Sequence, residues 1–131
     1  MKNLLIILSS VFALFIVSCT RKAYSTNGET IYRTGKNING EKLLDKSKSK
    51  ITIIKSCQGC HGNNGDRIGR CNLKWSHLTN PNEMKVPYND SLFSRFFDED
   101  LKSDGTPART GVHWQLTQQD KKDLIEFLKT L

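Results

Sequence analysis

The sequence predicts a small all-α domain, and three observations support this fold class. Residues 89–107 and 117–131 carry the apolar spacing of amphipathic helices. No part of the chain alternates strands with helices in the manner of a βαβ protein. The chain has 131 residues, 37% hydrophobic and 25% charged, which fits one domain with an appendage and excludes a disordered chain, a collagen and a multi-span membrane protein.

The first 18 residues have the pattern of a secretory signal peptide. Lys2 supplies a positive charge, and residues 4–17 form an almost wholly apolar run, shorter than the roughly 20 residues of a spanning helix. The run ends Ile16-Val17-Ser18-Cys19, which resembles a bacterial lipobox. This resemblance implies cleavage before Cys19 and a lipid on its sulfur. The alternatives are an uncleaved anchor helix and ordinary cleavage beside an incidental cysteine.

This interpretation divides the chain into three parts. Residues 1–18 are the signal peptide of lipoprotein type, residues 19–30 are a small, polar tether, and residues 31–131 are the folded domain. The mature protein is then expected to be an exported lipoprotein, anchored to a membrane and facing the periplasm, which is an oxidising compartment.

The first half of the domain shows few regular patterns. Residues 27–50 contain three glycines, and we expect this stretch to form turns between short segments. Residues 51–54 are apolar and β-branched, which fits a short strand or a poor helix packed against apolar surface. Residues 57–88 form a long stretch rich in Gly and Pro. A loop of this length is usually functional or is organised by something other than its own hydrogen bonds.

Two helices are predicted in the second half. The first has Asn89-Asp90-Ser91 as N-cap residues and ends at Gly105 and Pro107. The second begins after Thr117, an N-cap residue with Asp120 three positions on. The expected apolar faces are Leu92, Phe93, Phe96, Phe97 and Leu101 in the first helix, and Leu124, Ile125, Phe127, Leu128 and Leu131 in the second. The expected solvent side of the second helix is Lys121, Lys122, Asp123, Glu126 and Lys129.

The pentapeptide Cys57-Gln58-Gly59-Cys60-His61 is the attachment pattern for c-type haem. Two thiols three positions apart can add to the two vinyl groups along one haem edge, and the adjacent imidazole then reaches the iron. Three other interpretations are weaker. A thioredoxin-like pair needs a βαβ context, a zinc site would depend on Cys71 and His77 at an unconvincing spacing, and a disulfide between Cys57 and Cys60 would be strained.

Beyond this motif, residues 27–131 resemble a class I mono-haem c-type cytochrome domain. Residues 27–35 resemble the lead-in of a bacterial branch of this family, and Cys57 to Gly65 resembles its haem motif with a trailing Gly-x-x-Gly. Residues 87–92 resemble the start of the middle helix, and residues 114–117 with 120–131 resemble the closing helix.

The resemblance implies three to five short helices around one covalently bound haem c, with the N- and C-terminal helices packed on each other. It implies single-electron transfer between respiratory or periplasmic redox partners, so that the protein is an electron carrier and not an enzyme by itself. Carried over to this chain, Cys57 and Cys60 become the thioether anchors, and His61 becomes the proximal iron ligand.

The sequence departs from the family at the second axial ligand of the iron. Such domains usually place a Met shortly before the closing helix, whereas residues 110–113 read Thr-Gly-Val-His. The sixth ligand is therefore left open between His113, Met84, His77, water and a vacant position. A vacant position would indicate a different function: a haem ligand-binding or sensor module, or an oxidoreductase subunit.

Other residues have weaker assignments. Arg70, Trp75, Tyr88 and Trp114 can donate to haem propionates, although packing is the more common role of such side chains. Cys71 is expected to be a small buried side chain.

The chain carries 20 Lys and Arg against 13 Asp and Glu, a net charge of +7. Basic residues that flank the haem motif favour redox partners with an acidic docking surface. The alternatives are a generally solvated basic surface and attraction to an anionic bilayer. No motif for nucleic-acid binding is present.

Overall fold

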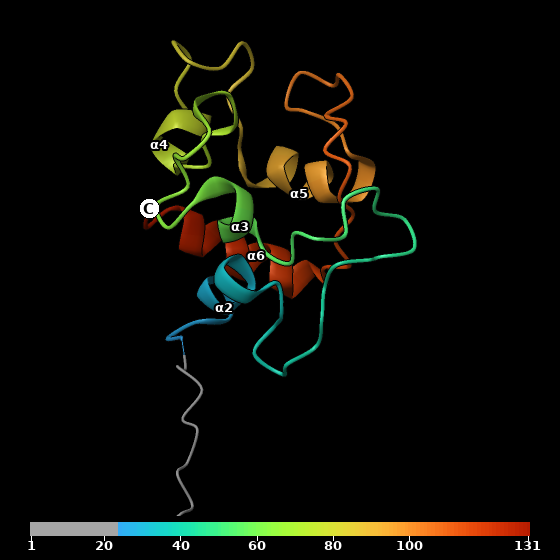
Figure 1. The fold of residues 1–131 in the computed structure, drawn as a ribbon. Coiled ribbons are helices and arrows are strands. Elements are labelled where there is room, and N and C mark those ends of the chain that lie inside the picture. The colour runs from blue at the N-terminus through green and yellow to red at the C-terminus, as the bar shows by residue number, and fades with distance from the viewer. Residues whose placement is uncertain (1–23) are drawn as a thin grey trace, which may run out of the picture.

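Helices make up all of the regular secondary structure in residues 24–131, which are the residues that the computed structural model describes (Figure 1). In chain order these elements are α2 (Asn27–Thr34), α3 (Cys57–His61), the 3-10 helix η1 (Gly69–Cys71), α4 (Trp75–Leu78), α5 (Asp90–Glu99) and α6 (Gln118–Leu128). Extended pairing in this range is limited to three isolated bridges. The all-α prediction is therefore confirmed for the described residues.

The predicted signal peptide, Cys19 and most of the predicted tether lie outside the described residues. Within residues 24–131, none of the helices has the length and apolar character needed to cross a membrane.

Helix α2 packs against α6 and begins inside the predicted tether. Thr26 caps the helix by accepting a hydrogen bond from the Glu29 backbone N–H at 3.1 Å. Gly28 allows the close contact, because a Cβ at this position would overlap the backbone carbonyl of Asp123 in α6. The folded domain thus starts at or before residue 27, and the boundary at residue 30 and the turns predicted at 27–34 are wrong.

The caps of α5 and α6 agree with the sequence signals. The Asn89 side chain accepts from the Leu92 backbone N–H, and Thr117 with Asp120 forms a complete capping box. Helix α5 ends at Glu99, earlier than predicted, because Asp100 takes a left-handed conformation with φ 52°. Leu101 consequently lies outside the helix, in an isolated bridge with Pro107.

Lys121 was expected on the solvent side of α6 but is only 3% exposed. Its ammonium group is paired with the carboxylate of Asp98 on α5. The pair joins the two helices, so the periodicity of α6 misplaced this residue.

Residues 36–56 connect α2 to α3 without helix or strand, and they pair with the segment before α6. The Gln115 backbone N–H donates to the Leu43 carbonyl at 2.7 Å, and the Ile51 N–H donates to the Gly111 carbonyl at 3.0 Å. Residues 51–54 form neither the predicted strand nor a helix. Ile53 is 89% exposed and Ile51 41%, so these two side chains are not packed against apolar surface as expected, whereas Ile54 is half-buried.

Candidate functional site

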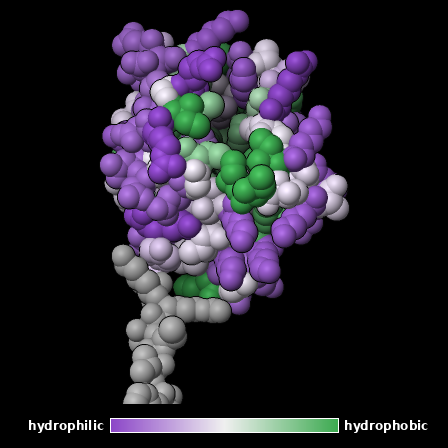
Figure 2. All heavy atoms as spheres, in the orientation of Figure 1, coloured by the Kyte–Doolittle hydropathy of each residue, from purple (hydrophilic) through white to green (hydrophobic). Residues whose placement is uncertain are grey.

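A cavity of about 370 Å³ lies between the short elements of the domain. Most of its lining is apolar, and its size falls within the range of small-molecule and cofactor sites. On the face seen in Figure 2, apolar side chains gather around a recess and hydrophilic side chains surround them. The residues that line it and enter the argument below are Tyr32, Cys57, Cys60, His61, Arg70, Cys71, His77, Met84, Tyr88, Val112, His113 and Trp114.

The haem motif forms α3, at one wall of this cavity. Ser56 caps the helix by accepting from the Gly59 backbone N–H at 3.3 Å. Residues three apart share one face of a helix, so Cys57 and Cys60 both line the cavity. Burial raises the pKa of the Cys57 thiol to about 12. In the absence of a metal this thiol is therefore neutral at physiological pH, which disfavours a redox-active thiolate.

His61 is fixed in a single tautomer by its neighbour. Its Nδ1 lies 2.8 Å from the backbone carbonyl oxygen of Cys71. Because a carbonyl oxygen can only accept, Nδ1 must carry the hydrogen, and Nε2 keeps its lone pair. Burial also lowers the pKa of His61, which favours the neutral ring. A neutral imidazole whose other nitrogen donates to a carbonyl is the usual form of a metal-binding histidine.

The structure brings all three candidates for the sixth ligand to the same cavity. Met84 is half-buried and packs against the hydrophobic core. His77 has its Nδ1 at 3.8 Å from a carboxylate oxygen of Glu83. The side chain of His113 is exposed, whereas its backbone N–H donates to the Ser49 hydroxyl at 2.9 Å. No distance in this arrangement selects one ligand over the others.

The predicted zinc alternative receives no support from the geometry. Within residues 24–131, no three His, Cys, Asp or Glu side chains come together as a group that could hold a metal ion. The described cysteines Cys57, Cys60 and Cys71 are all free thiols. Cys71 is exposed, which corrects the expectation that it is a buried side chain.

The four candidate propionate donors fall into two groups. Arg70, Tyr88 and Trp114 line the cavity, whereas Trp75 does not. Trp75 instead packs edge-on against Phe93, with ring centroids 5.8 Å apart, and its ring lies under the Lys129 ammonium. For Trp75 the packing role is thus the one observed.

Sequence analysis did not single out Tyr32, which the structure places at the cavity wall behind α3. Its side chain is 0% exposed, and its hydroxyl donates to the Gly62 carbonyl oxygen at 2.7 Å. Burial raises the pKa of this phenol to about 12, so the donor stays protonated. The only sequence signal for Tyr32 was its position within the lead-in residues 27–35. No sequence spacing links Tyr32 to Gly62.

Comparisons with known proteins return no match. No protein-family model fits the chain, and no curated protein or solved structure is significantly similar to it.

Proposed function

We propose that the protein is a mono-haem c-type cytochrome that carries single electrons between redox partners in the periplasm. The observation that carries this proposal is the wall formed by α3. Two thiols and an imidazole with a free Nε2 line the same apolar cavity. The all-α architecture with α2 packed on α6 is the arrangement that the family resemblance implies, and the cytochrome c fold is part of the proposal.

The residues of the cavity fit a haem. A porphyrin supplies four nitrogen donors to its iron, so the protein needs to add only one or two. This agrees with residues 24–131, in which no three His, Cys, Asp or Glu side chains come together. Cys57 and Cys60 would hold the ring through thioether bonds, and His61 would bind the iron. The bound group would supply a one-electron couple. Apolar side chains around it would exclude water, and Arg70 and Trp114 would serve the propionates, whereas the Tyr88 hydroxyl is already engaged by Ser103.

The experiment is expression of the full chain in a bacterium with an intact cytochrome c maturation system, followed by a pyridine haemochrome assay. We expect one haem per chain that resists extraction with acidified acetone. A Cys57→Ser/Cys60→Ser variant should lose the pigment, and the matched variant Cys71→Ser should keep it. A colourless wild-type protein, or pigment that the acid acetone removes, would contradict the proposal.

The sixth ligand is proposed as His113 or Met84, and the spectrum decides between them. A thioether ligand gives a near-infrared band in the oxidised protein, and two imidazoles give a distinct low-temperature EPR spectrum and a lower reduction potential. Met84→Leu should abolish the first signature, and His113→Ala the second. A protein in which neither substitution changes the spectrum has neither residue as its ligand.

A second function rests on one feature of the cavity wall. Between α5 and α6 no Met lines this wall, and His113, the one imidazole there, is exposed. The other lining residues of this segment are Asp100, Lys102, Ala108, Thr110, Val112 and Trp114. If the iron keeps an open position, the protein is a haem ligand-binding or sensor module, or an oxidoreductase subunit. Rapid binding of carbon monoxide by the reduced protein would favour this function, and an inert six-coordinate iron would favour the carrier.

The surface near the cavity supports transient docking of a redox partner through apolar contacts and electrostatic attraction. Ile51, Ile53 and Ile68 are large exposed apolar residues, and all but Ile53 line the cavity. Exposed basic residues stand near them in the sequence: Lys50, Lys55, Arg67 and Arg70. We propose that the partner docks here with an acidic surface and that a lipid on Cys19 holds the protein at the membrane. Electron transfer should then slow as ionic strength rises.

A further inference from the structure

Helix α3 is too short to fix the position of His61 by itself. It has five residues, Cys57–His61, and a helix of this length is unstable in isolation because nucleation costs more than its few hydrogen bonds return. The direction of the His61 ring must therefore be set by contacts from outside the helix. One of these is the hydrogen bond from Nδ1 to the Cys71 carbonyl.

A second outside contact acts on the peptide that ends the helix. Gly62 follows His61 directly, has φ 77°, and donates its N–H to the Gln58 carbonyl at 2.9 Å. Its own carbonyl oxygen accepts the buried hydrogen bond from the Tyr32 hydroxyl at 2.7 Å. The phenol thus holds the backbone one residue away from the imidazole.

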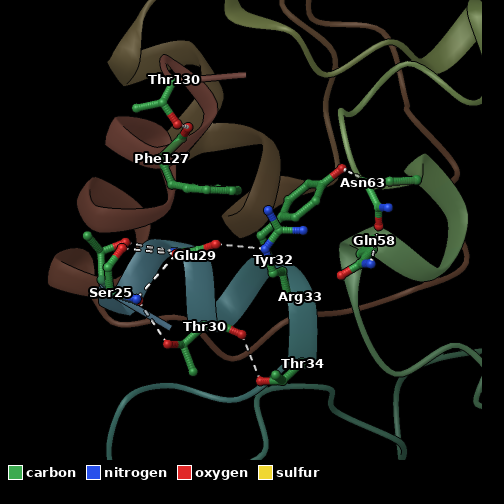
Figure 3. A network of polar contacts seen from close by, with 12 residues as sticks. Ser25, Glu29, Thr30, Tyr32, Arg33, Thr34, Gln58, Asn63, Phe127 and Thr130 are labelled. Carbon is green, nitrogen blue, oxygen red and sulfur yellow. Dashed lines mark hydrogen bonds and ion pairs between the residues drawn. The ribbon is translucent and has the colours of Figure 1, made fainter. Parts of the chain in front are cut away.

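Tyr32 is itself held firmly. It belongs to α2, which packs on α6, and its ring meets the Phe127 ring of α6 with centroids 5.3 Å apart. Figure 3 shows the Tyr32 ring reaching from α2 toward the turn that follows α3, next to Asn63. The hydroxyl cannot move far unless α2 moves against α6, so the hydrogen bond connects α3 to the best-packed part of the domain.

We propose that Tyr32 is a positioning residue for His61: its hydroxyl fixes the end of α3 and so the orientation of the imidazole toward the cavity. This inference depends on the proposed function only in that iron is what the ring binds. The hydrogen bond itself predicts a rigid, single-tautomer His61 with or without a metal.

The test compares Tyr32→Phe with Tyr88→Phe in the haem-loaded protein. Tyr88 is the matched control, because it is also buried and lines the cavity, whereas its hydroxyl interacts with Ser103 and not with α3. In Tyr32→Phe the Gly62 carbonyl loses its donor and stays more negative near His61, which favours the oxidised iron. We expect the ratio of reduced to oxidised protein at a fixed potential to fall about threefold, equal to about 30 mV.

We also expect a change in the EPR signal of the oxidised iron in Tyr32→Phe and none in Tyr88→Phe. Equal shifts in the two variants, or no shift in either, would overturn the proposal, since a general loss of packing affects both. If Tyr32→Phe does not keep its haem, a fluorinated tyrosine placed at position 32 retains the ring and strengthens the donor. The potential should then rise, and an unchanged potential would contradict the inference.

A separate readout distinguishes this inference from the proposed function. If the wild-type protein carries no covalent haem, the proposed function fails, and the nitrogen NMR shifts of the His61 ring still report its tautomer. In that case the wild-type protein and Tyr88→Phe should show the Nδ1–H form alone, and Tyr32→Phe should show a mixture of both forms. A single tautomer in all three proteins would overturn the positioning role.

Discussion

The two sides of the domain are built in different ways. On one side α2 and α6 pack directly against each other, with Ile31, Tyr32, Leu124 and Leu128 almost fully buried between them. The Asn27 side chain adds hydrogen bonds to Asp120 and Asp123 of α6 at 3.0 and 2.8 Å. This side resembles an ordinary helix pair, although Tyr32, Leu124 and Leu128 also border the cavity.

On the other side, residues 57–88 form only three short helical segments, α3, η1 and α4. Many of their side chains line a cavity, which residues of α2, α5 and α6 also border. Contacts within the polypeptide therefore stabilise the α2–α6 side, whereas on the proposed function a bound haem would bury the lining of the cavity side. Stability within one domain is uneven where apolar contacts are few, and the difference can be measured.

The largest difference between the two sides should follow removal of Cys57 and Cys60, the thiols proposed to anchor the haem. In Cys57→Ser/Cys60→Ser we expect amide exchange in residues 62–88 to accelerate about a thousandfold, which corresponds to about 4 kcal/mol. The amides of α6 should keep most of their protection. Hydrogen exchange followed by mass spectrometry checks both regions, with Cys71→Ser as the control. Equal acceleration in both regions would show that the two sides are not independent.

A substitution on the α2–α6 side should have a smaller effect that is spread over the whole domain. A Cβ at Gly28 would overlap the Asp123 backbone, so Gly28→Ala must separate the helices and should cost about 3 kcal/mol of unfolding free energy. Urea denaturation measures this loss. Gly69→Ala is the matched control, since a Cβ there meets no atom within 4 Å. If Gly28→Ala lost no more unfolding free energy than Gly69→Ala, the α2–α6 contact would accommodate a Cβ without loss of stability.

The ion pair between α5 and α6 should contribute less to the free energy of unfolding than the α2–α6 contact at Gly28. Asp98→Asn leaves the buried Lys121 ammonium without its partner, and because Asp98 is half exposed we expect a loss of about 1–2 kcal/mol. Asp90→Asn removes an exposed pair with Lys129 and should cost no more than about 0.5 kcal/mol. Urea midpoints of the two variants test the difference, and equal losses would contradict the role of burial.

Sequence reasoning succeeded where the signal is local. The caps of α5 and α6 depend on side chains that bond a backbone group three residues away, so Asn89, Thr117 and Asp120 could be read directly. The residue pattern failed at α2, which only the family resemblance implied, because Asn27 and Gly28 are turn-forming residue types in isolation. Their roles in the helix pair depend on α6, which is about 90 residues distant in sequence.

The same limit applies to the candidate site. The Cys-x-x-Cys-His motif indicated α3 and His61, because its chemistry is contained in five neighbouring residues. The Cys71 carbonyl and the Tyr32 hydroxyl reach the motif from other elements, and a backbone carbonyl leaves no mark on a sequence pattern. Lys121 was misplaced for a related reason, since its partner Asp98 belongs to another helix.

The smallest expected effect concerns the loop that pairs with the segment before α6. The Asp45 carboxylate accepts hydrogen bonds from the Ser47 hydroxyl at 2.6 Å and from the Gln115 side chain at 2.9 Å, and these bonds lower the pKa of Asp45 to about 2. Because the folded pKa lies below the ordinary value of 3.8, the stabilisation is complete above about pH 4 and disappears between about pH 4 and pH 2.

We therefore expect the urea midpoint of the wild-type protein to fall over this interval more steeply than that of Asp45→Asn, whose amide does not titrate. At pH 7 the variant should be the less stable of the two, and near pH 2 the two midpoints should converge. If the urea midpoints of the two proteins ran parallel over the whole pH range, ionisation of the Asp45 carboxylate would contribute nothing to stability. The segment that carries His113 would then be held mainly by its backbone hydrogen bonds and the Ser49 hydroxyl.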